Sequence, residues 1–160
     1  MKALIYYGIA LVIILLDQVT KWLVVQRMEI GQSIPIIENI FHLTSHRNAG
    51  AAFGILQGQM WLFFIATLIV LVVVAYYIQT QGKNHPWFGV CLGLVLGGAI
   101  GNFIDRLLFG EVVDFLDVYI GTYNFPIFNV ADSALVVGVI MLIIYVFKED
   151  AQKANSNSKK

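Results

Sequence analysis

The chain has 160 residues, of which 59% are hydrophobic and only 12% are charged, and its mean hydropathy is +0.78. This composition is too apolar for a soluble domain and is typical of a small polytopic membrane protein. Basic and acidic side chains are balanced at 10 each, so the net charge does not indicate a nucleic acid partner. The single cysteine, Cys91, excludes an intrachain disulfide and a cysteine-based zinc site.

Four segments are apolar and long enough to cross the hydrocarbon core, which takes about 20 residues. They cover residues 3–25, 60–78, 87–104 and 130–147. The first is predicted to be a retained helix, because its apolar run continues past Asp17 and Lys21 without a small-x-small cleavage site. We therefore predict a mostly α-helical membrane protein, a four-helix bundle that forms one domain over residues 1–148. Residues 149–160 are predicted to be a polar, disordered cytoplasmic tail.

An even number of spans places both termini on the same side of the membrane. Lysines in the short tails and in one short loop gather on that side: Lys2, Lys83, Lys148, Lys153, Lys159 and Lys160. Because positive charge in short loops marks the cytoplasmic side, we predict cytoplasmic termini. The loops that carry most of the acidic residues are then extracytoplasmic.

Two spacings within the spans predict helix contacts. Asp17 and Lys21 are four residues apart with the acid first, which is the favourable order for an ion pair on one helical face. A glycine recurs at every fourth position of the third span, which favours close packing of a neighbouring helix; these are Gly89, Gly93, Gly97 and Gly101.

The first extracytoplasmic loop is too long for a simple connection. Residues 34–37 and 40–44 are β-type residues with partial alternation, so they predict a small β-element. Residues 47–54 (RNAGAAFG) combine a polar pair with very small residues, and they predict a short interfacial helix or turn.

Acidic side chains at or near the hydrocarbon are the strongest functional signal, because each costs a few kcal/mol to insert. Asp114 and Asp132 lie in apolar surroundings, VVDF and FNVAD, that would desolvate their carboxyl groups. Two such groups that share one proton and hold a water form the machinery of an aspartic protease. Asp117, which is predicted to lie in a loop, is the nearest rival for a place in the dyad, and Asp132 is alternatively a plain acid at a helix N-terminus. Asp105 is next to Arg106, and two interpretations stay open: an ion pair at the membrane end, or a role in positioning the site.

Other chemistries lack their motifs. The histidines do not show HExxH spacing, and no GxSxG, Walker or GxGxxG pattern occurs, so neither a metal nor an organic cofactor is expected. Three other functions stay open at this point. They are a proton-coupled transporter, a magnesium-dependent lipid phosphotransferase, and a membrane scaffold that uses the glycine seam.

Five short motifs in order give the chain a family resemblance. They are DQVTK (17–21), RNAGAAF (47–53), GNFIDR (101–106), VVDF (112–115) and FNVAD (128–132). Together they resemble the lipoprotein signal peptidase family, also called signal peptidase II. The resemblance implies a multi-pass enzyme of the bacterial plasma membrane with its active site at the outer face. It would hydrolyse the bond before the diacylglyceryl-modified cysteine of prolipoproteins, using an aspartate dyad and an activated water.

The resemblance also implies roles for single residues. The catalytic pair would be Asp114 and Asp132, with Asp17 and Lys21 as a structural motif. Six further positions would line or support the site: Asn48, Asn102, Asp105, Arg106, Asn129 and Ala131. The implied partners are lipid-modified prolipoproteins and membrane lipids, and the protein is expected to act as a monomer without a metal or cofactor.

Overall fold

The computed structural model of the protein describes residues 2–50 and 59–157. The helices are α1 (Lys2–Arg27), α2 (Met60–Tyr77), α3 (Pro86–Phe109) and α4 (Val130–Asn157), and the π-helix η2 (Ile78–Gly82) continues α2. The strands are β1 (Ser33–Ile37), β2 (Phe41–Asn48), β3 (Val112–Ile120) and β4 (Tyr123–Asn124). The strands form one antiparallel sheet in the order β1-β2-β3-β4.

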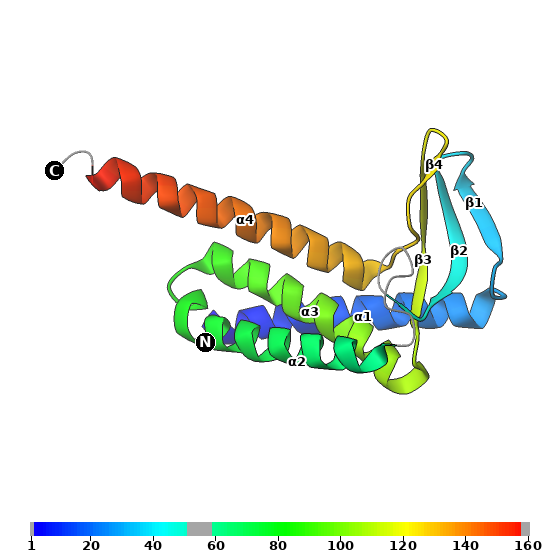
Figure 1. Ribbon diagram of the computed structural model, residues 1–160, viewed down its shortest axis with the longest axis horizontal. Helices are drawn as coiled ribbons and strands as arrows, with labels where there is room; N and C mark the ends of the chain where they lie inside the picture. The colour runs from blue at the N-terminus through cyan, green and yellow to red at the C-terminus, as the bar shows by residue number, and fades with distance from the viewer. Residues whose placement is uncertain (1, 51–58, 158–160) are drawn as a thin grey trace.

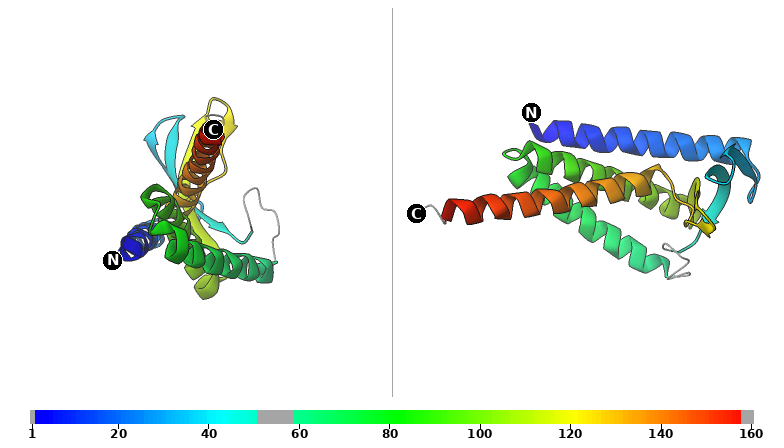
Figure 2. Two further views of the ribbon diagram at one scale, coloured as in Figure 1. Left: turned by 90° about the vertical axis from the view of Figure 1, so that its left-hand side faces the viewer. Right: turned by 90° about the horizontal axis from the view of Figure 1, so that it is seen from above.

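The helices run side by side, and the sheet stands across one end of them (Figure 1). The start of α1 and the end of α4 both lie at the opposite end from the sheet. Seen from above, α4 extends past the other helices at that end (Figure 2, right). The predicted topology, with both termini on one side and a small β-element on the other, therefore agrees with the fold.

Four helices in the described part of the chain are long and apolar enough to cross a membrane, as predicted. Their apolar outer side chains are exposed, as Leu68 and Val72 of α2 show with 62% and 63% exposure. Large exposed apolar surface of this kind suits contact with lipid tails. The candidate spans are Ala3–Arg27, Met60–Gly82, Pro86–Phe109 and Val130–Gln152.

The prediction of a disordered tail after residue 148 is wrong for most of its length. Helix α4 continues without a break to Asn157. Residues 148–154 (KEDAQKA) are mostly good helix formers, so the helix propagates from the membrane span into the polar segment. Hydropathy indicates where the membrane span ends, but it does not indicate where the helix ends.

Helix α3 is the most buried of the four spans, and α1 and α4 pack on it. The predicted glycine seam is the contact with α1. A Cβ atom on Gly93 would lie 2.8 Å from the carbonyl oxygen of Tyr6, and one on Gly97 would lie 2.7 Å from the Cβ of Ile13. Only glycine allows this backbone approach, so helix packing explains the repeat.

The sheet confirms one prediction and corrects another. Residues 34–37 lie in β1 and residues 41–44 lie in β2, as predicted, whereas residue 40 is in the turn between the two strands. The sequence did not predict β3, and Asp117 lies within this strand rather than in a loop. Aspartate is unfavourable in strands, so the two acids of β3 hide the β pattern. The predicted interfacial helix or turn begins in β2, and its residues 51–54 lie outside the described residues.

A left-handed turn connects α3 to β3. Gly110 ends the helix with a φ of +76°, and its N–H bonds to the carbonyl of Arg106. Glycine adopts this conformation without steric cost. The turn sends β3 back across the end of the bundle, which places Asp114 beside the first turn of α4.

Candidate active site

The candidate site lies where the sheet meets the helices. Asp114 of β3 and Asp132 of the first turn of α4 line the same cavity, which has a volume of about 800 Å³. The structure thus brings together the two acids that the sequence analysis selected. The other polar lining residues are Ser133 of α4 and five side chains of β2 and the C-terminal half of α3: His46, Arg47, Asn48, Asn102 and Arg106.

Asp132 is held by a reciprocal cap at the N-terminus of α4. Its Oδ2 accepts a hydrogen bond of 3.2 Å from the backbone N–H of Asn129, and Asn129 Oδ1 accepts one of 2.9 Å from the backbone N–H of Asp132. This is the capping-box geometry. The other oxygen, Oδ1, accepts a 2.7 Å bond from Asn102 Nδ2. The helix-end interpretation of Asp132 is therefore correct, and it is compatible with a place in the cavity.

Asp114 is only 2% exposed, and two amides donate to its carboxyl group. Asn129 Nδ2 lies 2.7 Å from Oδ1, and Asn48 Nδ2 lies 2.9 Å from Oδ2. Burial raises the pKa of Asp114 to about 6, and the charge of Asp132 acts in the same direction, whereas the two amide donors lower the pKa. Asn129 thus connects the two carboxyl groups, through its side chain to Asp114 and through its N–H to Asp132.

A buried charge cluster lies directly behind this pair. Lys21 Nζ is 2.8 Å from Asp17 Oδ2, which confirms the predicted ion pair, and it is 3.0 Å from Asp105 Oδ2. Asp105 therefore does not form the considered ion pair with Arg106, because neighbouring residues on a helix point in different directions. Gln18, which the sequence analysis missed, donates to Asp105 Oδ1 at 2.8 Å.

Ala131 is buried at the point where three helices meet. Its backbone N–H donates to Asp17 Oδ1 at 2.9 Å, and the residue is fully buried. A Cβ atom on Gly101 would lie 3.1 Å from the Cβ of Ala131. A larger side chain at position 131 would collide with α3, so alanine is required to seat the N-terminus of α4.

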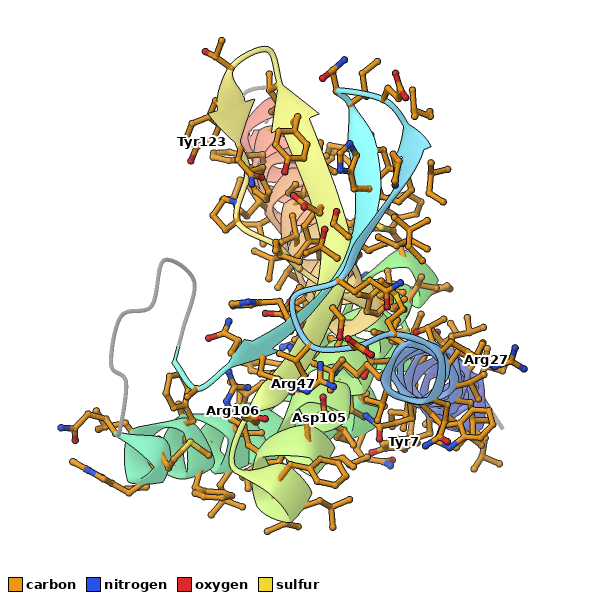
Figure 3. All side chains as sticks on the ribbon, turned by 90° about the vertical axis from the view of Figure 1, so that its right-hand side faces the viewer. Tyr7, Arg27, Arg47, Asp105, Arg106 and Tyr123 are labelled. Carbon is orange, nitrogen blue, oxygen red and sulfur yellow. The ribbon has the colours of Figure 1, made fainter. Side chains whose placement is uncertain are left out.

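Two arginines stand at the cavity wall near the turn that follows β2. Arg106 Nη2 donates to the carbonyl of Gly50 at 3.2 Å, and its guanidinium lies 4.5 Å from the centre of the Phe63 ring. Arg47 Nε is 3.9 Å from Glu111 Oε1. Figure 3 shows Arg47, Arg106 and Asp105 gathered where the sheet joins the helices, far from Tyr123 at the tip of the sheet.

The remaining wall of the cavity is apolar. It is formed by the segment before α4 and by the second turn of α4: Phe125, Pro126, Ile127, Phe128, Leu135, Val136 and Val137. The sequence does not mark these residues as part of a site, because apolar side chains that line a cavity are indistinguishable in sequence from lipid-facing ones. The cavity therefore has charged groups on one wall and hydrocarbon on the other.

The sequence comparisons agree with each other. A family model described as signal peptidase (SPase) II matches residues 9–148. The chain belongs to the signal peptidase II family. A protein named lipoprotein signal peptidase from Halalkalibacterium halodurans is 62% identical over 147 residues, which are 92% of this chain and 94% of that protein. One of the same name from Bacillus subtilis is 58% identical over 150 residues, which are 94% and 97% of the two chains.

A structural comparison supports the same assignment. A solved structure described as a bacterial membrane enzyme aligns with a TM-score of 0.87 and 46% identity, covering 92% of this chain and 90% of that one. The predicted resemblance and fold class are confirmed. Membership of the signal peptidase II family implies a peptidase, which disfavours the transporter, phosphotransferase and scaffold alternatives.

Asp117, the rival acid, does not line the cavity of this family member. It lies on β3 opposite His42, is 2% exposed, and accepts a 2.6 Å hydrogen bond from Thr44 Oγ1 and a 3.4 Å one from the Tyr119 hydroxyl. Ser133 does line the cavity, and its hydroxyl donates to the carbonyl of Asn129 at 2.9 Å, as helix hydroxyls commonly do. The cavity's acidic pair is therefore Asp114 and Asp132.

Proposed function

We propose that this chain removes signal peptides from bacterial prolipoproteins by hydrolysing the peptide bond before the diacylglyceryl-modified cysteine, with Asp114 and Asp132 as an aspartic dyad. The observation that carries the proposal is that both carboxyl groups line one cavity and are joined by the amides of Asn102 and Asn129. Two carboxyl groups in such surroundings hold one proton between them more readily than two charges.

The geometry supports a general acid–base mechanism. The ionised carboxylate of the dyad removes a proton from a water held between the two groups, and the water attacks the scissile carbonyl. The protonated partner donates its hydrogen to the carbonyl oxygen as the carbon becomes tetrahedral. Each such proton transfer contributes about 10²- to 10⁴-fold to the rate. Arg47 and Arg106 lie on the same cavity wall and supply positive charge for polar oxygens of the substrate.

The position of the cavity suits a lipid-anchored substrate. The cavity lies at the end of the bundle that carries the sheet, opposite the start of α1 and the end of α4 (Figure 1). With cytoplasmic termini, as the lysine distribution indicates, this end is extracytoplasmic. The apolar wall would receive the acyl chains from the bilayer while water reaches the polar wall.

A defined substrate tests this function. We expect a synthetic prolipoprotein with a diacylglyceryl cysteine to be cleaved in a bilayer immediately before that cysteine. The same peptide without the diacylglyceryl group should be cleaved at least about 100-fold more slowly, because the loss of its acyl chains costs several kcal/mol of apolar burial. Mass spectrometry of both fragments identifies the bond. Equal cleavage of the two peptides, or cleavage at another bond, would contradict the proposal.

The pH dependence should change when Asn48 is replaced. The Asn48 amide lowers the pKa of Asp114, so Asn48→Ala should raise this pKa further and let the dyad keep its proton to higher pH. The basic limb of kcat/KM against pH then moves upward, by up to about 1 unit for the loss of one hydrogen bond. Glu111→Gln, a change beside the same cavity rim, is the control and should not move the limb upward. A downward shift or no shift in Asn48→Ala would refute the assignment.

A further inference from the structure

Lys21 is a buried cation with all of its hydrogen-bond donors occupied. The side chain is 3% exposed, and its ammonium group lies 2.8 Å from Asp17 Oδ2, 3.0 Å from Asp105 Oδ2 and 3.0 Å from Asn102 Oδ1. A lysine has three N–H donors, so the three contacts use all of them. The carboxylates of Asp17 and Asp105 neutralise the charge of the lysine, whereas the third contact is made to the neutral amide of Asn102, which is hydrogen-bonded to Asp132 of the dyad.

The third contact determines which way the Asn102 amide points. Asn102 Oδ1 accepts from Lys21 Nζ and, at 3.0 Å, from Asn129 Nδ2, which occupies both of its lone pairs. The Asn102 Nδ2 group must then face the other way, where it donates to Asp132 Oδ1 at 2.7 Å. A flipped amide would place Oδ1 against the carboxylate of Asp132, so that two acceptors face each other. It would also place Nδ2 against the Lys21 ammonium and the Asn129 amide, so that donors face donors. The cation therefore makes Asn102 a hydrogen-bond donor toward Asp132.

The two acids that neutralise Lys21 also hold the backbone beside each member of the dyad. Asp17 Oδ1 accepts from the N–H of Ala131, the residue before Asp132, at 2.9 Å. Asp105 Oδ2 accepts from the N–H of Val113, the residue before Asp114, at 3.1 Å. A single buried cluster thus sets the positions of both carboxyl groups from behind, without touching the cavity.

The surroundings of the two carboxyl groups are unequal. Asp132 is half-buried at a helix N-terminus, where the helix dipole and the N–H of Asn129 favour a negative charge. Asp114 is 2% exposed on a strand between Val113 and Phe115, which are 5% exposed each. Its two amide donors do not offset this burial, since burial is the largest influence on its pKa and leaves the pKa well above that of an ordinary aspartate.

We propose that Lys21 is a positioning residue that gives the two acids of the dyad different roles. Through Asn102 it keeps Asp132 ionised as the base, and the shared proton stays on Asp114, which acts as the acid. This inference rests on the proposed function, because it assigns roles within that dyad. The charged and titratable groups that face the dyad from the elements packed against it are Asp17 and Lys21 of α1, His46 and Arg47 of β2, and Asp105 and Arg106 of α3.

Infrared spectroscopy of the resting enzyme in a bilayer tests the location of the proton without any turnover. We expect the C=O band of a protonated carboxyl group near pH 5 that is absent in Asp114→Asn and present in Asp132→Asn. Both substitutions replace a carboxyl group by an amide of nearly the same shape. A band that disappears in Asp132→Asn and persists in Asp114→Asn would overturn the assignment of roles.

A Lys21→Gln variant tests the part played by the cation. Losing the positive charge should raise the proton affinity of the dyad, so both limbs of the pH profile of kcat/KM move to higher pH by about 1 unit. Tyr6→Phe is the control for mere loss of stability, because it removes the buried bond from the Tyr6 hydroxyl to the carbonyl of Gly82 (3.0 Å) away from the cavity. Tyr6→Phe should lower the melting temperature and leave both limbs in place.

The outcomes separate the inference from the function on which it rests. A Lys21→Gln enzyme with a lower melting temperature and unchanged pH limits would show a purely structural lysine and overturn the inference. If Lys21→Gln does not fold, the infrared comparison of the two aspartate variants still decides where the proton lies. Full activity in Asp114→Asn or Asp132→Asn would instead overturn the dyad itself.

Discussion

Asp114→Asn and Asp132→Asn should each reduce cleavage of a diacylglyceryl prolipoprotein by about 10³-fold or more, while the protein still inserts and folds. An amide keeps the shape of the carboxyl group and one of its two accepting oxygens, but it can neither take a proton from water nor give one to a carbonyl. General acid–base steps of this kind are worth about 10²- to 10⁴-fold each. The measurement is the initial rate of fragment release from a synthetic substrate in lipid bilayers.

Asp117→Asn is the matched control for this loss. Asp117 lies on the same strand as Asp114 and is equally buried at 2% exposure, but it is hydrogen-bonded to Thr44 and does not line the cavity. Its variant should cleave at close to the parent rate. Processing by Asp114→Asn at near the parent rate would show that the dyad is wrongly assigned, and loss of activity in Asp117→Asn alone would select the rival acid.

Gly97→Ala should destabilise the helix bundle by about 1–3 kcal/mol, which is the usual cost of overpacking a close contact. The new Cβ would lie 2.7 Å from the Cβ of Ile13 and 2.8 Å from the carbonyl oxygen of Ala10. Both atoms belong to or adjoin the rigid backbone of α1, so α1 and α3 must separate to admit a methyl group. Thermal unfolding in detergent, followed by tryptophan fluorescence or circular dichroism, measures the change.

Gly8→Ala provides the comparison within the same bundle. A Cβ atom on Gly8 would meet nothing within 4 Å, so this variant should unfold at or slightly above the parent temperature, because alanine is the better helix former. If Gly97→Ala were as stable as Gly8→Ala, the close contact between α1 and α3 would not be what holds the bundle together at this point.

Several features of the site were accessible from the residues in order along the chain. The pair Asp17 and Lys21 shares a helical face because residues four apart are neighbours in any helix. The repeat that includes Gly93 and Gly97 likewise predicts a smooth helix face before its partner is known. The acids of the motifs VVDF and FNVAD are conspicuous because a carboxyl group in apolar sequence is costly and needs a reason.

Other features depended on contacts between distant segments. The sequence left open whether Asp105 would pair with Arg106, and the structure pairs it with Lys21 of another helix at 3.0 Å. Strand β3 was missed because its two acids hide the β pattern, and its pairing with β2 shows that it is a strand. Gln18 carries no signal beyond its place in a motif, and only packing places its amide against Asp105.

The sequence by itself determined the four apolar spans, the membrane class, the glycine seam and the identity of the acids, because hydropathy and helical spacing are local properties of a chain. The tertiary structure decided that Asp114 and Asp132 share one cavity, and that Asn129 connects them. It also decided that Lys21 serves two acids and an amide at once. These facts follow from where helices and strands pack, since a hydrogen bond between residues far apart in the chain forms only when packing brings its two atoms within about 3 Å.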